Sequence, residues 1–132
     1  MTQTWTPSSL RLLYLEDEAI IALETVDTLH DLGFNHVDQV YTLEAADQAV
    51  ATAQPDIALL DVNLSHGRTS FDLSERLLAA GVPVVMATGY SRANLPAHPA
   101  VEVIEKPTTA LQLEEALQRA WARRDALAGG PF

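Results

Sequence analysis

The sequence contains no cysteine, which excludes disulfide bonds, a thiolate nucleophile and metal sites with sulfur ligands. It is also poor in cations, since 8 lysines and arginines stand against 18 acidic residues and the formal net charge is −10. Phosphate backbones attract clustered cations, so we expect no nucleic-acid partner. No apolar run approaches the length of a membrane span, and no basic segment followed by an apolar stretch opens the chain. We therefore expect a soluble, cytoplasmic protein without a membrane partner.

A single compact domain accounts for the 132 residues, because 48% of them are hydrophobic, which is enough to fill one core. We place this domain at residues 10–124, between a flexible N-terminal arm at residues 1–9 and a flexible C-terminal tail at residues 125–132. Trp5 in the arm has the size and apolar character to fold back onto the domain. Short apolar runs alternate with longer amphipathic stretches, which predicts an α/β fold with a doubly wound parallel sheet.

Five apolar runs mark the expected strands, at residues 10–15, 37–40, 57–60, 84–87 and 101–104. We expect helices that end near Leu32, begin after a Thr42 cap, and cover residues 70–80 and 109–124. The core face of the first helix is predicted from a three-residue repeat: Ile20, Leu23, Val26, Leu29 and Leu32. The core face of the last helix is predicted as Leu113, Ala116, Leu117, Ala120 and Trp121. Between the last two strands, Pro96 and Pro99 predict a short or mobile fourth helix.

Residues with chemical function gather where the expected strands end, which is where doubly wound sheets bind ligands. The strand ends lead to Glu16 and Asp17, to Asp61, to Thr88 and to Lys106. Three close carboxylates repel one another unless a hard cation lies among them, and oxygen ligands suit Mg2+. A phosphoryl group on Asp61 would then meet this cation, the Lys106 ammonium and the Thr88 hydroxyl.

Lys106 is the only lysine, and the seven other cationic side chains are all arginine. A compact point charge differs from the planar arginine fork, which gives a physical reason for a lysine beside a phosphate. Pro107 follows, and an X-Pro peptide bond is the kind that adopts the cis form. We interpret Ser65, in the stretch after Asp61, as an ordinary loop residue.

Four short motifs resemble those of the bacterial response-regulator receiver family: LEDE at residues 15–18, LLDVNL at 59–64, MATGY at 86–90 and EKPT at 105–108. The resemblance covers about residues 10–124 and implies a flavodoxin-like sheet of order 2-1-3-4-5 with helices on both faces. It also implies site roles: an acidic metal pair at Glu16 and Asp17, a phosphoacceptor at Asp61, a switch hydroxyl at Thr88 and a phosphate-contacting lysine at Lys106. The carbonyl of Asn63 would complete the Mg2+ shell.

The chain departs from the common receiver pattern at Val103, where many receivers carry an aromatic residue that rotates on phosphorylation. MATGY instead resembles the motif of the FATGUY subgroup, with Met86 in place of its phenylalanine. Tyr90, two residues after Thr88, is then our candidate for a substitute switch. The alternative is that Tyr90 is an ordinary loop aromatic.

The resemblance implies a response regulator of a two-component or phosphorelay system, acting as a monomer or weak homodimer. A sensor histidine kinase or histidine phosphotransfer protein would donate the phosphoryl group, and a downstream protein partner would read the result. Such a module turns over no separate metabolite, so we do not class it as an enzyme. The alternatives are a degenerate receiver that binds without phosphorylation, a receiver excised from a hybrid histidine kinase, and an aspartate-nucleophile phosphohydrolase. Such phosphohydrolases usually carry a second acid two residues after the nucleophile, where this chain has Asn63.

Overall fold

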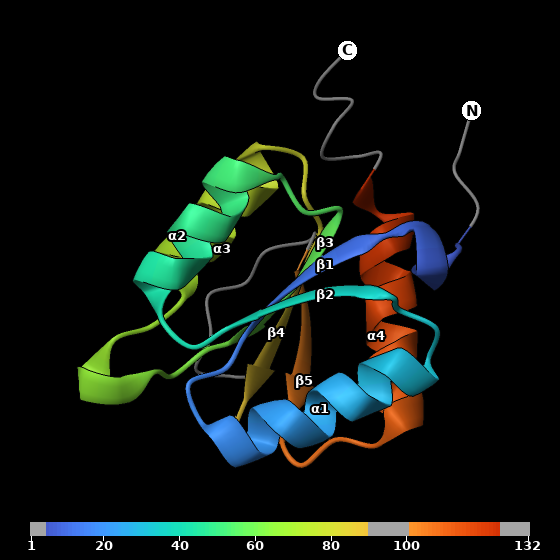
Figure 1. The fold of residues 1–132 in the computed structure, drawn as a ribbon, viewed down its shortest axis with the longest axis horizontal. Helices are drawn as coiled ribbons and strands as arrows, with labels where there is room; N and C mark the ends of the chain where they lie inside the picture. Colours follow the sequence, from blue (N-terminus) through green and yellow to red (C-terminus); the bar gives the residue numbers. More distant parts are fainter. Residues whose placement is uncertain (1–4, 90–100, 125–132) are drawn as a thin grey trace.

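The computed structural model describes residues 5–89 and 101–124, which form a five-stranded parallel sheet between two layers of helices (Figure 1). The strands are β1 (Arg11–Leu15), β2 (His36–Val40), β3 (Ile57–Asp61), β4 (Val84–Thr88) and β5 (Val101–Glu105). The helices are α1 (Ala19–Asp31), α2 (Leu43–Thr52), α3 (Phe71–Ala79) and α4 (Ala110–Ala122), with short 3-10 helices at Pro7–Ser9 and Ser65–Gly67. The strands pair in the order β2-β1-β3-β4-β5, which confirms the expected fold.

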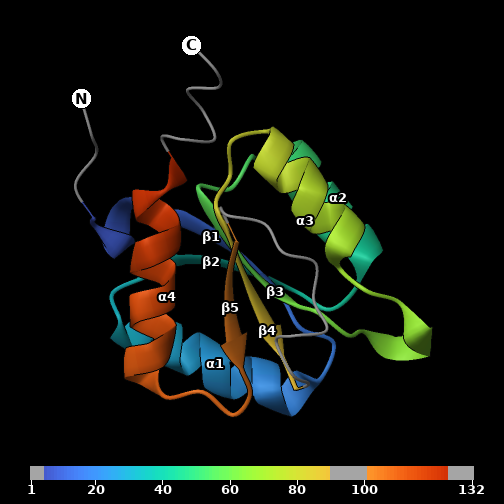
Figure 2. The same ribbon diagram turned by 180° about the vertical axis from the view of Figure 1, so that it is seen from behind.

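Each face of the sheet has its own core, because successive strand residues point to opposite faces. α1 and α4 cover one face, where Leu12 and Leu59 are buried, and α2 and α3 cover the other, where Leu13 and Leu60 are buried (Figures 1 and 2). All residues of β3 and β4 are buried, as expected for central strands that are covered on both sides. The sheet is therefore a rigid base for the loops at its carboxyl edge.

The core face predicted for the last helix is confirmed, since all five of its residues are buried in α4. A capping box starts this helix: Thr109 Oγ1 accepts from the Gln112 N–H, and the Gln112 side chain accepts from the Thr109 N–H. The peptide bond between Lys106 and Pro107 is cis. The cap thus fixes the start of α4 a few residues after Lys106.

The core face predicted for the first helix is wrong in its first half. Ile20 and Leu23 are 77% and 67% exposed, whereas Ala22 and Leu29 are buried and Val26 packs against them in part. Each residue turns an α-helix by about 100°, so a repeat of three residues drifts by about 60° at every step and soon leaves the starting face. The spacing of four and three residues from Ala22 to Leu29 stays on one face.

Trp5 packs onto the domain and joins an aromatic cluster with Phe34 and Trp121. Its ring centroid lies 5.9 Å from that of Phe34 and 6.3 Å from that of Trp121. Phe34 precedes β2, and Trp121 lies in the last turn of α4, so this cluster is at the amino ends of the strands (Figure 1). The N-terminal segment thus covers the end of the core opposite Asp61.

Several sequence predictions lie outside the described residues: the short or mobile helix between the fourth and fifth strands, Tyr90 as a switch, the flexible C-terminal tail at residues 125–132 and the first four residues of the N-terminal arm. The helix labelled α4 is the one that was predicted at residues 109–124. Among the helices of residues 5–89 and 101–124, none has both the length and the apolar character that crossing a membrane requires.

Candidate functional site

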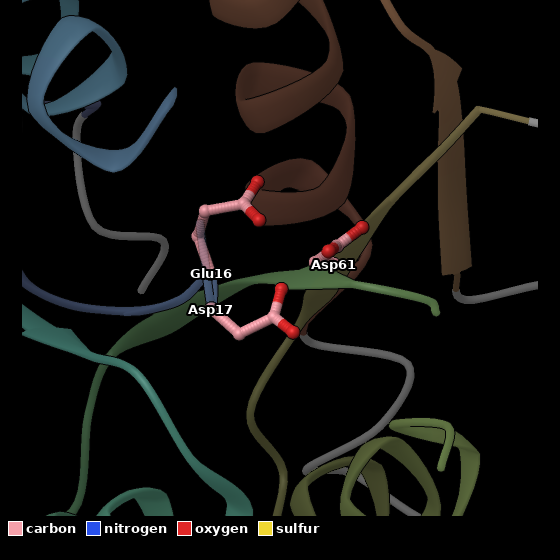
Figure 3. Close-up of side chains that lie close together, drawn as sticks. All are labelled: Glu16, Asp17 and Asp61. Carbon is pink, nitrogen blue, oxygen red and sulfur yellow. The ribbon is translucent and has the colours of Figure 1, made fainter. Parts of the chain in front are cut away.

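Glu16, Asp17 and Asp61 converge at the carboxyl edge of the sheet (Figure 3). β1 and β3 are adjacent and parallel, with Leu15 paired with Leu60, so the residues that follow on each strand lie side by side. Each of the three side chains offers a carboxylate oxygen, and these oxygens lie within 4.8 Å of one another. The structure thus brings together the three carboxylates that the sequence placed at strand ends.

Lys106 forms ion pairs with two of these carboxylates. Its Nζ donates to Glu16 Oε1 at 3.0 Å and to Asp61 Oδ1 at 2.8 Å. Burial opposes the charged form of Lys106, but the contacts with Asp61 and Glu16 outweigh it and raise the pKa of the ammonium. The Lys106 N–H also donates to the carbonyl of Thr88 at 2.7 Å, which ties the lysine to the end of β4.

Glu16 is unusual for a carboxylate because only 1% of it is exposed. This burial raises the pKa of Glu16; the hydrogen bond from Lys106 opposes the rise, and the negative charge of Asp61 adds to it. A buried carboxylate beside a second one is costly unless positive charge offsets both. One ammonium among three carboxylates leaves the cluster negative, so it favours a further cation.

Asp17 is more accessible than Glu16 and lies against the 3-10 helix Ser65–Gly67. Its Oδ2 accepts the Ser65 N–H at 2.8 Å and the Ser65 hydroxyl at 2.5 Å. Slight burial acts in the opposite direction, but the bonds from Ser65 keep the pKa of Asp17 below its usual value. The sequence interpretation of Ser65 missed this contact, because the two residues are 48 positions apart and no local pattern links them.

Thr88 and Asn63 flank the carboxylates. Thr88 is the last residue of β4 and is fully buried, and its neighbour Ala87 pairs with Asp61 in the sheet. The Thr88 side chain is therefore held one strand away from Asp61. Asn63 is exposed, two residues beyond Asp61, and its backbone forms an isolated bridge with Thr69.

The chemistry of this cluster fits Mg2+, which prefers hard oxygen ligands and one or two carboxylates. Glu16, Asp17 and Asp61 are the residues that would hold the ion. Beside them, a cavity of about 380 Å3 opens between α1, the sheet and the start of α4, lined by Asp61 and Lys106 among others. The cavity thus borders both Asp61 and Lys106.

Comparison with known proteins gives a consistent result. Residues 12–118 match the family model described as response regulator receiver domain. The solution structure of SdrG from Sphingomonas melonis is 34% identical, with 84% of this chain and 95% of that chain covered and a TM-score of 0.73. No curated protein matches the chain.

Two further solved structures are similar. The receiver domain of the PhyR response regulator from Erythrobacter litoralis is 26% identical, with coverage of 85% of this chain and 89% of that chain and a TM-score of 0.71. A response regulator receiver protein from Sinorhizobium medicae is 24% identical, with coverage of 87% and 96% and a TM-score of 0.78. At that level of identity the second likeness concerns the fold alone.

Proposed function

This chain belongs to the response regulator receiver family, and on that premise we propose that Asp61 accepts a phosphoryl group in a reaction that requires Mg2+. One observation carries the proposal: Asp61 shares a cluster with two other carboxylates and also accepts a hydrogen bond from the only lysine of the chain. A solvated carboxylate without a chemical role would not require either the adjacent carboxylates or the lysine.

In the proposed reaction an oxygen of Asp61 attacks the phosphorus of a phosphohistidine. The new bond joins this oxygen to phosphorus, the phosphorus–nitrogen bond breaks, and the imidazole of the donor leaves. Mg2+, when bound, neutralises charge on the phosphoryl oxygens and lines up the attack. The Lys106 ammonium then contacts one phosphoryl oxygen, the Thr88 hydroxyl donates to another, and Asn63 contributes its carbonyl to the metal shell.

Lys106 and Thr88 also connect this chemistry to the rest of the domain. The Lys106 N–H donates to the Thr88 carbonyl. Movement of either side chain toward a phosphoryl group would therefore shift the backbone at the ends of both β4 and β5. Thr88 is accordingly our switch residue. From the MATGY motif we further infer membership of the FATGUY subgroup, with Tyr90 as the second switch residue.

We infer that the phosphodonor, a sensor histidine kinase or histidine phosphotransfer protein of the cytoplasm, docks over the start of α1. This helix begins three residues after Glu16 and exposes two large apolar side chains, Ile20 and Leu23. Leu111, in the first turn of α4, is 62% exposed and follows Ala110, which lines the cavity. Apolar side chains that flank a reactive group are typical of a protein interaction site.

The alternatives from the sequence are a binding module that works without phosphorylation and a receiver excised from a hybrid histidine kinase. Receiver domains in general are signalling modules rather than enzymes, and a downstream protein partner would read either state. The contact between Asp61 and Lys106 favours the phosphoacceptor over a degenerate module, because a phosphorylation-independent surface would not require a partly buried ion pair.

The test is incubation with acetyl phosphate and Mg2+, followed by intact-mass measurement. We expect the mass of one phosphoryl group, and we expect Asp61→Ala and added chelator each to abolish it. Asp72→Asn, in an exposed part of α3, is the matched control and should be labelled like the unchanged chain. Absence of label from the unchanged chain, or label that survives Asp61→Ala, would contradict the proposal.

A further inference from the structure

Ser65 makes two hydrogen bonds to one oxygen of a carboxylate in the acidic cluster. Its N–H and its hydroxyl both donate to Asp17 Oδ2, at 2.8 Å and 2.5 Å. Asp17 follows β1, whereas Ser65 belongs to the loop between β3 and α3. These bonds therefore link the loop that carries Glu16 and Asp17 to the loop that follows Asp61.

The loop that presents Ser65 is closed at its base. The Leu64 N–H donates to the carbonyl of Arg68 at 2.8 Å, and the Ser70 N–H donates to that of Val62 at 3.1 Å. The chain reverses between these contacts through His66 and Gly67, both with positive φ, of 64° and 72°. Such a closed turn holds its backbone in one conformation, so the fold sets the position from which the Ser65 side chain projects.

The outer side of the same loop is also attached. Arg68 forms an ion pair with Glu44 of α2, with Nη2 and Oε2 2.9 Å apart. Both side chains are largely exposed, so this pair contributes little to stability. It still adds a contact between the loop and the helix layer, in addition to the hydrogen bonds at its base.

We propose that the Ser65 hydroxyl is a positioning group for the metal site: it orients the carboxylate of Asp17 so that Mg2+ binds without first having to order that side chain. Figure 3 shows the Asp17 carboxylate turned to the side of Asp61. Both bonds from Ser65 go to Oδ2, so neither uses the Oδ1 atom of Asp17. This inference rests on the proposed function, since it assigns a role within the same site.

The physical reason is the cost of ordering a short, accessible side chain. Asp17 is partly exposed, unlike Glu16 and Asp61, so packing alone does not fix its rotamer. Hydrogen bonds to the ligands of a metal typically change its affinity by about 10-fold to 100-fold when they are removed. The backbone bond from Ser65 survives any substitution there, so we expect the lower end of that range.

The experiment compares Ser65→Val with Ser65→Thr, two side chains of the same shape that differ in the hydroxyl. We expect Ser65→Val to bind Mg2+ about 10-fold more weakly in calorimetry with Mg2+ alone, and Ser65→Thr to bind it like the unchanged chain. The Mg2+ concentration for half-maximal labelling by acetyl phosphate should rise by the same factor in Ser65→Val. The labelling rate at saturating Mg2+ should stay within about twofold, because the hydroxyl does not touch the reacting atoms.

Two outcomes separate this inference from the proposed function. Equal Mg2+ affinities for the valine and threonine variants would overturn the role of Ser65, even with normal labelling of Asp61. Absence of label from the unchanged chain would overturn the proposed function, and Mg2+ calorimetry would still decide the role of Ser65. Melting temperatures of both variants in chelator check that each is folded, since Ser65 is exposed and its replacement should leave them nearly unchanged.

Discussion

The Nζ atom of Lys106 lies 2.8 Å from Oδ1 of Asp61, the carboxylate that we propose as the phosphoacceptor. The same ammonium contacts Glu16, so one lysine holds two of the three carboxylates that would bind Mg2+. A divalent ion that binds these oxygens competes with the ammonium for them. Under the proposed function, the lysine would stabilise the cluster before the ion binds and would then be released toward a phosphoryl group.

Replacement of Lys106 by methionine tests this competition. In chelator we expect the free energy of unfolding to fall by about 3 kcal/mol, because two mostly buried carboxylates lose their shared partner. Saturating Mg2+ should restore much of that loss, and Mg2+ itself should bind more tightly. Labelling by acetyl phosphate should be slower by about 100-fold, since a donor to the phosphoryl oxygens is lost.

Urea unfolding with and without Mg2+ measures the stability, and calorimetry measures the affinity. Arg76→Met is the matched control, because Arg76 forms its ion pairs on the exposed surface of α2 and α3. An Mg2+ affinity that falls in Lys106→Met would contradict the competition.

Replacement of Glu16 by glutamine should change how stability depends on pH. The raised pKa of Glu16, caused first by burial, means that the folded state binds its proton more tightly than the unfolded chain does. Ionised Glu16 therefore lowers stability at neutral pH, and this cost vanishes as the pH falls until the group is protonated in both states. In chelator, Glu16→Gln should melt at a higher temperature at neutral pH, with a difference that shrinks on acidification. If the difference in melting temperature between Glu16→Gln and the unchanged chain grows toward acid pH, the pKa of Glu16 is not raised by folding and the explanation is wrong.

A buried carboxylate outside the acidic cluster, Glu102 of β5, holds α4 against the sheet. It is 8% exposed and accepts hydrogen bonds from Arg119, at 2.7 Å, and from Arg123. Loss of Arg119 alone should lower the free energy of unfolding by about 1 kcal/mol, because its side chain is half exposed and the second arginine remains. Loss of both should cost about 3 kcal/mol, because the buried carboxylate is then left without these partners.

Urea unfolding of Arg119→Ala, Arg123→Ala and the double variant measures these costs. Arg11→Ala is the control, since Arg11 pairs with Asp38 at an exposed site and should contribute less than about 0.5 kcal/mol. If the double variant loses only as much free energy of unfolding as two exposed ion pairs would contribute, the burial of Glu102 has no effect on stability.

Replacement of Trp5 by alanine should lower stability without affecting phosphorylation. Trp5 is partly buried and contacts Phe34 and Trp121 at the amino ends of the strands. We expect a loss of about 2 kcal/mol, less than for a fully buried tryptophan. The rate of labelling at a temperature where the variant is folded should match that of the unchanged chain. A slower rate would reveal coupling between the two ends of the sheet.

Replacement of Leu23 by glutamate tests the docking surface on α1. The side chain is 67% exposed, so the change should cost less than about 0.5 kcal/mol of stability. Transfer from a phosphorylated histidine protein should slow by about 10-fold or more, because an apolar contact is replaced by a charge. Labelling by acetyl phosphate needs no docking and should not change. Gln48→Glu on α2 adds the same charge elsewhere, and equal slowing by both variants would exclude a specific role for α1.

Much of this molecule could be predicted from the sequence, for reasons that particular residues illustrate. The apolar runs of β3 and β4 are central strands, and parallel strands necessarily bring Glu16, Asp17 and Asp61 to one edge. The capping box of α4 was not predicted, although Thr109 and Gln112 have the required spacing. Local patterns in the sequence are therefore enough to predict the central strands, the position of the three carboxylates and the cap of α4.

Other features could not be predicted, because they depend on contacts between distant segments. The exposure of Ile20 and Leu23 is an exception: both were assigned to the core from a three-residue repeat, and the helical period alone predicts the drift away from that face. Arg119 and Arg123 lie near the end of α4, and both donate to Glu102 on a strand, 17 and 21 positions earlier in the chain. Such pairings follow from how α4 packs across β5, and the sequence contains no local sign of it.

The position of the two tryptophans affects how this protein can be studied with light. They are the only ones in the chain, and they touch each other at the far end of the molecule from Asp61. Their emission therefore reports whether the N-terminal segment is attached, and an unchanged spectrum on adding metal would say nothing about binding. An optical probe of the phosphorylation site would need a new chromophore near the carboxyl edge, and exposed Leu111 is a position that tolerates one.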